Sequence, residues 1–218
     1  MTTGGDTTTT RGTVVHKPER LEAIVLAGGA GRRFGGGKLL APWRHGLLIE
    51  AALDCAFAAP ARSVILVTGA DADVMPVALE YALREGEASR LRIVHAQDHA
   101  EGMGASLRAG VAALPDDADG VFVFLGDMPL IPPDVPPRLA KALGDGAPAA
   151  APSHDGKRGH PVLFGAQLFP ALRTATGDEG ARAALKALGD HLALIPTNDP
   201  GVLFDVDTPD ALTSDAKP

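Results

Sequence analysis

The sequence predicts one α/β domain in which a mostly parallel β-sheet lies between two layers of helices. Short apolar runs alternate with segments of helical period, as in repeated strand–helix units. These runs lack the polar alternation of a half-exposed strand, which favours strands buried on both faces of a parallel sheet. With 218 residues, 45% of them hydrophobic, the chain is large enough for one sizeable core.

The first half of the chain repeats the strand–helix unit. Strands are expected at 23–27, 64–68, 91–95 and 121–125. Helices are expected between them at 49–58, at about 72–85, and from 104 onward. Ser106, or a residue just before it, is the expected N-cap of this third helix.

The second half is less regular. After a polar loop at 153–159, residues 161–164 form a further strand candidate, where we expect an antiparallel or mixed edge of the sheet. Helices near 167–174 and 180–188 are followed by an apolar run at 192–196. No repeat or linker is visible, so we predict one domain over 21–213, a disordered tail at 1–20 and a short tail at 214–218.

The composition excludes several classes of partner. The formal net charge is −7, so no broad basic face is available for a nucleic-acid backbone or an anionic membrane. The chain has no apolar run of about 18 residues and no secretory signal, which predicts a soluble, cytoplasmic protein. Cys55 is the only cysteine, which excludes an intrachain disulfide, and its apolar helical setting predicts packing in the core.

A loop rich in glycine and cations follows the first expected strand, at the end where open α/β sheets bind ligands. It reads Gly28-Gly29-Ala30-Gly31-Arg32-Arg33-Phe34-Gly35-Gly36-Gly37-Lys38. Glycine N–H groups can surround phosphate oxygens, while Arg and Lys supply positive charge. The spacing fits neither G-x-G-x-x-G nor G-x-x-x-x-G-K-[ST]. We therefore predict a different kind of polyphosphate-binding loop, with a flexible solvated turn as the alternative.

Two acidic segments complete the candidate chemistry. Asp127 follows the strand at 121–125, and Asp205-Val206-Asp207 lies near the C-terminus. We expect the two acids of the second segment to point in opposite directions, so that only one faces the site. Mg²⁺ commonly takes one or two protein carboxylates, so Asp127 with Asp207 would make an adequate site. Capping of a turn is the alternative explanation of a lone acid at a strand end.

Six motifs, taken together and in this order, resemble the molybdenum cofactor nucleotidyltransferases, in particular the cytidylyltransferase branch. The similarity extends from about Glu22 to Leu212. The motifs are the glycine-rich loop and the segments Gly102-Met103-Gly104-Ala105-Ser106-Leu107, Gly126-Asp127-Met128-Pro129, Gly159-His160-Pro161-Val162-Leu163-Phe164, Gly177-Asp178-Glu179-Gly180-Ala181-Arg182 and Asp205-Val206-Asp207-Thr208-Pro209.

The resemblance implies a three-layer, Rossmann-like nucleotidyltransferase fold with a mostly parallel, mixed central sheet. It implies a Mg²⁺-dependent enzyme that condenses molybdopterin with CTP or GTP and releases pyrophosphate. A molybdoenzyme or its chaperone would be a further partner. Because the phosphate of the acceptor is already an anionic nucleophile, we expect positioning and charge neutralisation to dominate catalysis.

The resemblance also assigns roles to residues by their place in the motifs. Arg33 and Lys38 would bind the triphosphate and stabilise charge at the α-phosphate, while Asp127 and Asp207 would hold Mg²⁺. The nucleotide would further contact Leu26, Ala27, Gly28, Gly29, Gly31 and Ser106. The acceptor would contact His160, Asp178 and Arg182, although His160 has an equally good structural role in its turn and the other two residues are spaced to pair with each other.

One departure concerns the base. The cytidylyl branch typically has Ala-Ala-Gly after the first strand, whereas Ala27-Gly28-Gly29 is more like the guanylyl branch. The motif around Asp127 and the C-terminal half favour CTP, with GTP as the alternative. Three other readings stay open: transfer to a different small phosphate acceptor, a non-catalytic molybdopterin carrier and, more distantly, a NAD-binding oxidoreductase.

Overall fold

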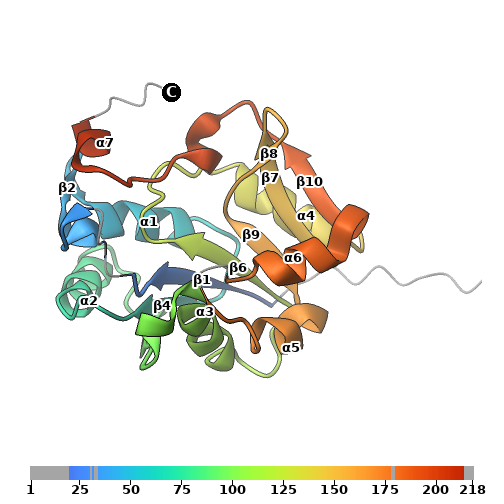
Figure 1. Ribbon diagram of the computed structural model, residues 1–218, viewed down its shortest axis with the longest axis horizontal. Coiled ribbons are helices and arrows are strands. Elements are labelled where there is room, and N and C mark those ends of the chain that lie inside the picture. Colours follow the sequence, from blue (N-terminus) through green and yellow to red (C-terminus); the bar gives the residue numbers. More distant parts are fainter. Residues whose placement is uncertain (1–19, 30, 32–33, 178–179, 214–218) are drawn as a thin grey trace, which may run out of the picture.

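A mixed, eight-stranded sheet forms the middle layer of the computed structural model, and helices cover both of its faces (Figure 1). The structure describes residues 20–29, 31, 34–177 and 180–213. The strand order is β10-β7-β9-β6-β1-β4-β5, with β8 paired to β7. The strands are β1 (Leu21–Ala27), β4 (Val64–Thr68), β5 (Leu91–His95), β6 (Gly120–Leu125), β7 (Ala149–His154), β8 (Lys157–Arg158), β9 (Val162–Gly165) and β10 (Leu192–Pro196).

The helices alternate with these strands through most of the chain. They are α1 (Leu48–Phe57), α2 (Val74–Arg84), α3 (Met103–Ala112), α4 (Val135–Gly144), α5 (Phe169–Leu172), α6 (Arg182–Leu188) and α7 (Pro209–Thr213). A small hairpin of β2 (Pro42–Trp43) and β3 (Gly46–Leu47) precedes α1. Among the described residues, no helix is long and apolar enough to cross a bilayer.

The predicted class, a mostly parallel sheet between helices, is confirmed, and β1 shows its physical basis. Ala23 and Val25 pack into one apolar cluster with α1, α2 and α4. Ile24 and Leu26 pack into a second cluster, with α3, α5 and α6. All seven residues of β1 are buried, because each face of the strand is covered by helices.

Three details differ from the sequence-based expectation. β5 is only partly buried, because it is an edge strand with a single neighbour. The antiparallel strand β9 is interior, between β6 and β7, and its four residues are buried; the edge on that side is β10. The segment 153–159, expected to be a loop, contains the end of β7 and the short strand β8 as a hairpin.

The helices also differ in detail. α3 begins at Met103 with Gly102 as its N-cap, so the expectation of an N-cap at or just before Ser106 is wrong; Ser106 lies within the helix and is 4% exposed. The helix expected at 167–174 is reduced to the single turn of α5, preceded by a 3₁₀ turn. α4 has two prolines in its first turn, where the helix requires no N–H donor, and it had not been predicted.

Cys55 lies on α1 and packs against the first apolar cluster, as expected. Its Sγ atom is 3.7 Å from the carbonyl oxygen of Pro129 and 3.9 Å from that of Ile131. Burial raises the pKa of the thiol to about 11. The thiol therefore stays protonated at neutral pH and is a poor nucleophile.

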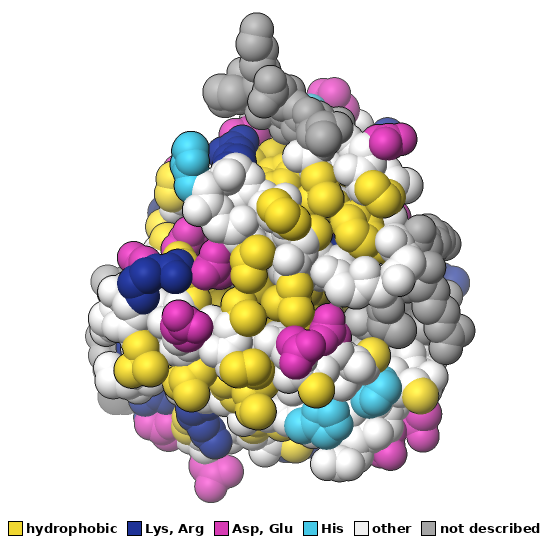
Figure 2. Space-filling view, turned by 90° about the vertical axis from the view of Figure 1, so that its left-hand side faces the viewer, with side chains coloured by type: hydrophobic (Ala, Val, Ile, Leu, Met, Phe, Trp, Pro, Cys, Tyr) yellow, Lys and Arg dark blue, Asp and Glu magenta, His cyan; other side chains and the backbone are white. Residues whose placement is uncertain are grey.

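One face of the molecule exposes apolar surface. Figure 2 shows hydrophobic side chains gathered across the side that carries α2 and α7, with charged groups around them. α2 contributes Met75, Leu79 and Leu83, which are 51%, 47% and 63% exposed and follow one another at intervals of four residues. The neighbouring stripe of the same helix packs inward through Val74 and Ala78, so the apolar surface of α2 extends beyond its buried face.

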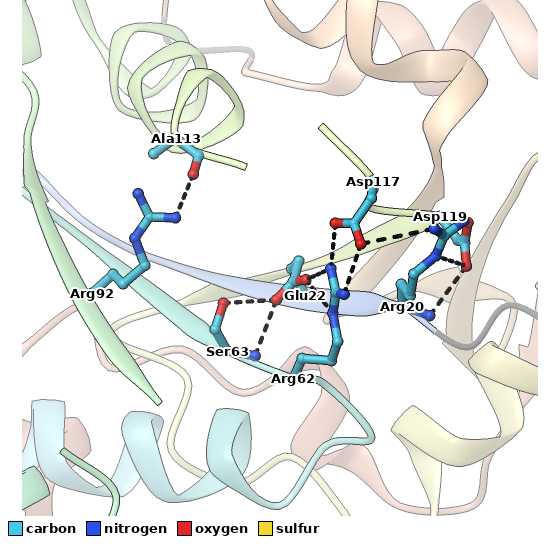
Figure 3. Close-up of polar contacts among 8 residues, drawn as sticks. All are labelled: Arg20, Glu22, Arg62, Ser63, Arg92, Ala113, Asp117 and Asp119. Atoms are coloured by element: carbon cyan, nitrogen blue, oxygen red, sulfur yellow. Dashed lines mark hydrogen bonds and ion pairs between the residues drawn. The ribbon is translucent and has the colours of Figure 1, made fainter. Parts of the chain in front are cut away.

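An ion-pair network holds together the amino ends of β1, β4 and β6 (Figure 3). The carboxylate of Glu22 is 1% exposed and accepts hydrogen bonds from Arg62 at 2.5 Å and from the hydroxyl of Ser63 at 2.7 Å. Arg62 also donates to Asp117 at 2.9 Å. Arg20, which had been assigned to the N-terminal tail, pairs with Asp119 at 2.8 Å. The rest of the predicted tails, 1–19 and 214–218, lies outside the described residues.

We expect Arg62→Ala to lower the free energy of unfolding by about 2–3 kcal/mol, because it leaves the buried Glu22 carboxylate without its cation. Urea denaturation of the purified variant measures this change. Arg20→Ala is the matched control, since its ion pairs are half-exposed, and it should lower the free energy of unfolding much less. Equal losses in the two variants would contradict this account of Glu22.

Candidate active site

A cavity of about 520 Å³ opens at the carboxyl ends of β1 and β6. Parallel strands that end at the same edge bring loops from distant parts of the sequence together there. The loop after β1 and the loop after β6 form one side of this cavity, and the start of α3 forms the other. The ion-pair network of Figure 3 lies at the opposite, amino edge of the same strands.

Most of the predicted nucleotide-binding residues line this one cavity. The described members of that set that contribute to its wall are Leu26, Ala27, Gly28, Gly29, Gly31, Lys38 and Ser106, together with Asp127. Arg33, the other predicted triphosphate ligand, lies outside the described residues. The arrangement supports the predicted set as a group, and the contact of each residue with a nucleotide stays a prediction.

Small residues allow the loop to fold close to α3. A Cβ atom at Gly28 would overlap Ser106 Oγ, so residue 28 must be glycine for the serine to keep this position. Gly31 has φ +54°, which favours glycine, and its carbonyl accepts a hydrogen bond from the N–H of Phe34 at 2.9 Å. The backbone can therefore approach a ligand without side chains in the way.

Lys38 joins the two predicted metal ligands. Its Nζ atom donates to Asp127 Oδ2 at 2.7 Å and to Asp207 Oδ1 at 3.2 Å. The lysine side chain is 11% exposed, against 27% for Asp127 and 49% for Asp207. The ammonium group thus lies where both carboxylates converge, which is the place a small cation would take.

The C-terminal acidic segment is fixed next to this group. The N–H of Val206 donates to the carbonyl of Asp127 at 3.0 Å, and the Val206 side chain is fully buried. Burial, followed by the negative charges of Asp207 and Asp127, raises the pKa of the Asp205 carboxyl above its ordinary value. The expectation that the two acids point in opposite directions does not follow from an extended segment, because residues i and i+2 of such a segment share a face. Asp207 is the one that contacts Lys38.

Within the described part of the chain, no group of three or more His, Cys, Asp or Glu side chains is placed to ligate a metal. A metal at this edge would accordingly rest on two carboxylates and on oxygen atoms from water or a ligand. That donor set suits Mg²⁺ or Mn²⁺ bound together with phosphates and does not suit a structural zinc site.

Of the residues predicted for the acceptor, His160 and Arg182 are not among those that line this cavity. His160 donates its backbone N–H to the carbonyl of Val202 at 2.9 Å, and its ring Nδ1 is buried with no hydrogen-bond partner among the described residues. Burial lowers the pKa of His160 to about 4, with a smaller contribution from the charge of Arg158, so the ring is neutral at neutral pH. Arg182 is exposed at the start of α6. Asp178 lies outside the described residues, so its pairing with Arg182 stays a prediction.

Sequence reasoning missed several lining residues. The far wall of the cavity contains Asp71, His99, Ala100, Glu101, Gly102 and Met103. Asp71 follows β4 and His99 follows β5, so both lie beyond the carboxyl ends of parallel strands. The rule that open sheets bind ligands at that edge would have identified them.

Comparison with known proteins agrees with this geometry. Residues 23–192 match the family model described as "MobA-like NTP transferase domain". The chain is 29% identical over 191 residues to the molybdenum cofactor cytidylyltransferase of Escherichia coli K12, covering 87% of this chain and 92% of that protein. It is 34% identical over 193 residues to the nicotine blue oxidoreductase of Paenarthrobacter nicotinovorans, covering 85% and 91%.

Solved structures show the same fold. The crystal structure of Rv0371c from Mycobacterium tuberculosis H37Rv superimposes with a TM-score of 0.73 at 27% identity, over 89% of this chain and 96% of that one. A structure of Rv0371c in complex with manganese superimposes with a TM-score of 0.62 at 23% identity, over 83% and 89%. The family match, which spans most of the domain, identifies the chain as a member of the MobA-like NTP transferases, a family of nucleotidyltransferases.

Proposed function

We propose that this protein condenses molybdopterin with CTP to give molybdopterin cytosine dinucleotide and pyrophosphate. The observation that carries the proposal is the cluster of Lys38, Asp127 and Asp207 beside a glycine loop at the carboxyl edge of the sheet. A cation and two acids at this place suit a triphosphate and its metal ion. The similarity to a cytidylyltransferase over most of the chain supports the same reaction.

In the proposed reaction, an oxygen of the molybdopterin phosphate attacks the α-phosphorus of CTP. The new P–O bond forms as the bond between the α-phosphorus and the bridging oxygen breaks, and pyrophosphate leaves with the electron pair. No proton has to be removed from an ionised phosphate, so this step requires no general base. Lys38 and Arg33 would bind the triphosphate and stabilise the charge that develops on it.

Asp127 and Asp207 would hold Mg²⁺, because both carboxylates already converge on one cationic atom, Lys38 Nζ. Bound there with the nucleotide, the ion would neutralise phosphate charge. The remaining nucleotide contacts would come from the backbone of the loop after β1 and from Ser106. His160, Asp178 and Arg182 would line the acceptor side, and a molybdoenzyme or its chaperone would receive the product in the cytoplasm.

Three alternatives to the proposed reaction differ in how well the site supports them. GTP in place of CTP is favoured by Gly28, which is packed against Ser106 and leaves no room for the alanine of the cytidylyl branch unless the serine moves. Transfer to another phosphate acceptor would use the same cavity. A molybdopterin carrier would not need the Lys38 cluster, and neither would the hydride chemistry suggested by the name of the oxidoreductase relative.

The proposed function predicts that pyrophosphate is released only when molybdopterin, Mg²⁺ and a nucleotide are all present. We expect CTP to give the highest kcat/KM among CTP, GTP, ATP and UTP, with the dinucleotide identified by mass spectrometry. A preference for GTP would correct the base and keep the reaction. If no nucleotide reacts with molybdopterin, the proposed acceptor is wrong.

The metal site predicts opposite effects of two substitutions on Mn²⁺ binding in the absence of nucleotide. Lys38→Met removes the ammonium group that lies between the two carboxylates, so Mn²⁺ should bind roughly tenfold more tightly or better. Asp127→Asn removes a ligand and should weaken binding by a similar factor. Electron paramagnetic resonance of free Mn²⁺ gives both affinities.

Lys141→Met is the control for this experiment, because Lys141 is exposed on α4 and pairs only with the nearby Asp145 among the described residues. It should bind Mn²⁺ like the unsubstituted protein. Lys38→Met should nevertheless lose turnover, since the triphosphate loses its cation. Weaker Mn²⁺ binding in Lys38→Met would show that the carboxylates are not the ligands.

A further inference from the structure

Two arginines near the proposed acceptor side have no acidic partner among the described residues. Arg158 ends β8, and Arg182 begins α6. Most other described arginines form an ion pair or a hydrogen bond, but these two form neither with any described residue. An arginine without an ion-pair partner is common on an exposed surface. The position of Arg158 and Arg182 relative to the site therefore decides whether they could bind a ligand.

The sheet topology brings Arg158 to the edge that holds Asp127. β9 runs antiparallel to β6, with Val162 opposite Val123, so the residues before β9 pass the carboxyl end of β6. The paired part of β9 begins at Val162, and the hairpin before it places Arg158 opposite Ser153 of β7. The turn between β8 and β9 therefore lies on the side of the sheet where β6 ends.

The turn that carries Arg158 is clamped in place. A Cβ atom at Gly159 would overlap the carbonyl oxygen of Val202, so only glycine fits there. The N–H of His160 donates to the same carbonyl, and four residues further on the N–H of Val206 donates to the carbonyl of Asp127. One C-terminal segment therefore contacts both the Arg158 turn and the metal edge, which fixes their relative position.

Arg182 reaches the same region from the other side. The carbonyl of Gly177 accepts a hydrogen bond from the N–H of Gly104 at 2.8 Å, which ties the segment before α6 to the start of α3. A Cβ atom at Gly180 would lie 3.3 Å from the sulfur of Met103, a residue of the cavity wall. Arg182 follows this contact by two residues, next to the nucleotide cavity.

The electrostatics support a shared ligand. Burial, and then the positive charge of Arg182, lowers the pKa of Arg158. The positive charges of Arg158 and Arg182 also lower the pKa of His160, in addition to the larger effect of its burial. Two cations that repel each other beside a buried, unpartnered imidazole nitrogen form a site that a multiply charged anion would stabilise.

We propose that Arg158, together with Arg182, binds the phosphate monoester of the acceptor and holds it toward the nucleotide cavity. The inference rests on the proposed function for the identity of the acceptor, and it adds Arg158 as a specificity-determining residue. Guanidinium groups suit this role because they donate two parallel hydrogen bonds to phosphate oxygens.

The kinetic test compares Arg158→Gln and Arg182→Gln with Lys157→Gln. Lys157 precedes Arg158 in the same exposed strand, so its side chain points to the opposite face and its substitution removes the same charge. KM for molybdopterin should rise on the order of ten- to a hundredfold in the two arginine variants. KM for the nucleotide should change by less than about twofold, and Lys157→Gln should match the unsubstituted protein. If Arg158→Gln behaves like Lys157→Gln, or raises both KM values together, the inference is overturned.

A binding test separates this inference from the proposed function. Inorganic phosphate is titrated by calorimetry into protein that holds Mg²⁺ and the α,β-methylene analogue of CTP or GTP, so that the triphosphate site is filled. Phosphate should bind to the unsubstituted protein and to Lys157→Gln, and at least about tenfold more weakly to Arg158→Gln. This result without any molybdopterin turnover would keep the phosphate subsite and reject molybdopterin as the acceptor. Equal phosphate binding in all three proteins, or none in any, would reject the subsite.

Discussion

The contact of Lys38 with Asp127 and Asp207 is the interaction on which the rest of this site depends. It joins residues that are 89 and 169 positions apart in the sequence. Only the pairing of β1 with β6, and the anchoring of Val206 on the backbone of Asp127, makes that contact possible. The pairing of two adjacent strands thus brings one cation and two carboxylates together at the same end of the sheet.

The two edges of the sheet use charge differently. At the amino edge, Glu22 and Arg62 satisfy each other within the protein, which stabilises the fold and leaves little to offer a ligand. At the carboxyl edge, glycine backbone, Lys38 and the acids surround a cavity, while Arg158 and Arg182 have no acidic partner among the described residues. The charged groups around the cavity are therefore a better guide to where a ligand binds than the negative net charge of the whole chain.

Local patterns in the sequence were enough to predict the parallel core. Apolar runs identify β1, β4 and β6 because burial on both faces acts on consecutive residues. The interior place of β9 depends on long-range pairing with β6 and β7, which no local pattern reports. The start of α3 was misjudged because Gly102, rather than a serine, caps it.

The candidate site was predictable to a similar degree. Lys38 and Asp127 follow strands that end at the same edge, so a common site could be inferred from their order along the chain. The side of the chain on which Asp205 and Asp207 lie became clear only from the buried Val206 between them. Arg158 could not be found from its own neighbours, because its place opposite Ser153 follows from the pairing of β8 with β7.

The central claim is nucleotidyl transfer at the Lys38 cluster, and the fate of a radiolabel tests it most directly. CTP and GTP labelled at the α-phosphorus, and in separate samples at the γ-phosphorus, are incubated with the protein, molybdopterin and Mg²⁺. The account predicts that the α label appears in the pterin product and the γ label in pyrophosphate. Transfer of the γ label to the pterin, or a pterin product without the α label, would contradict it.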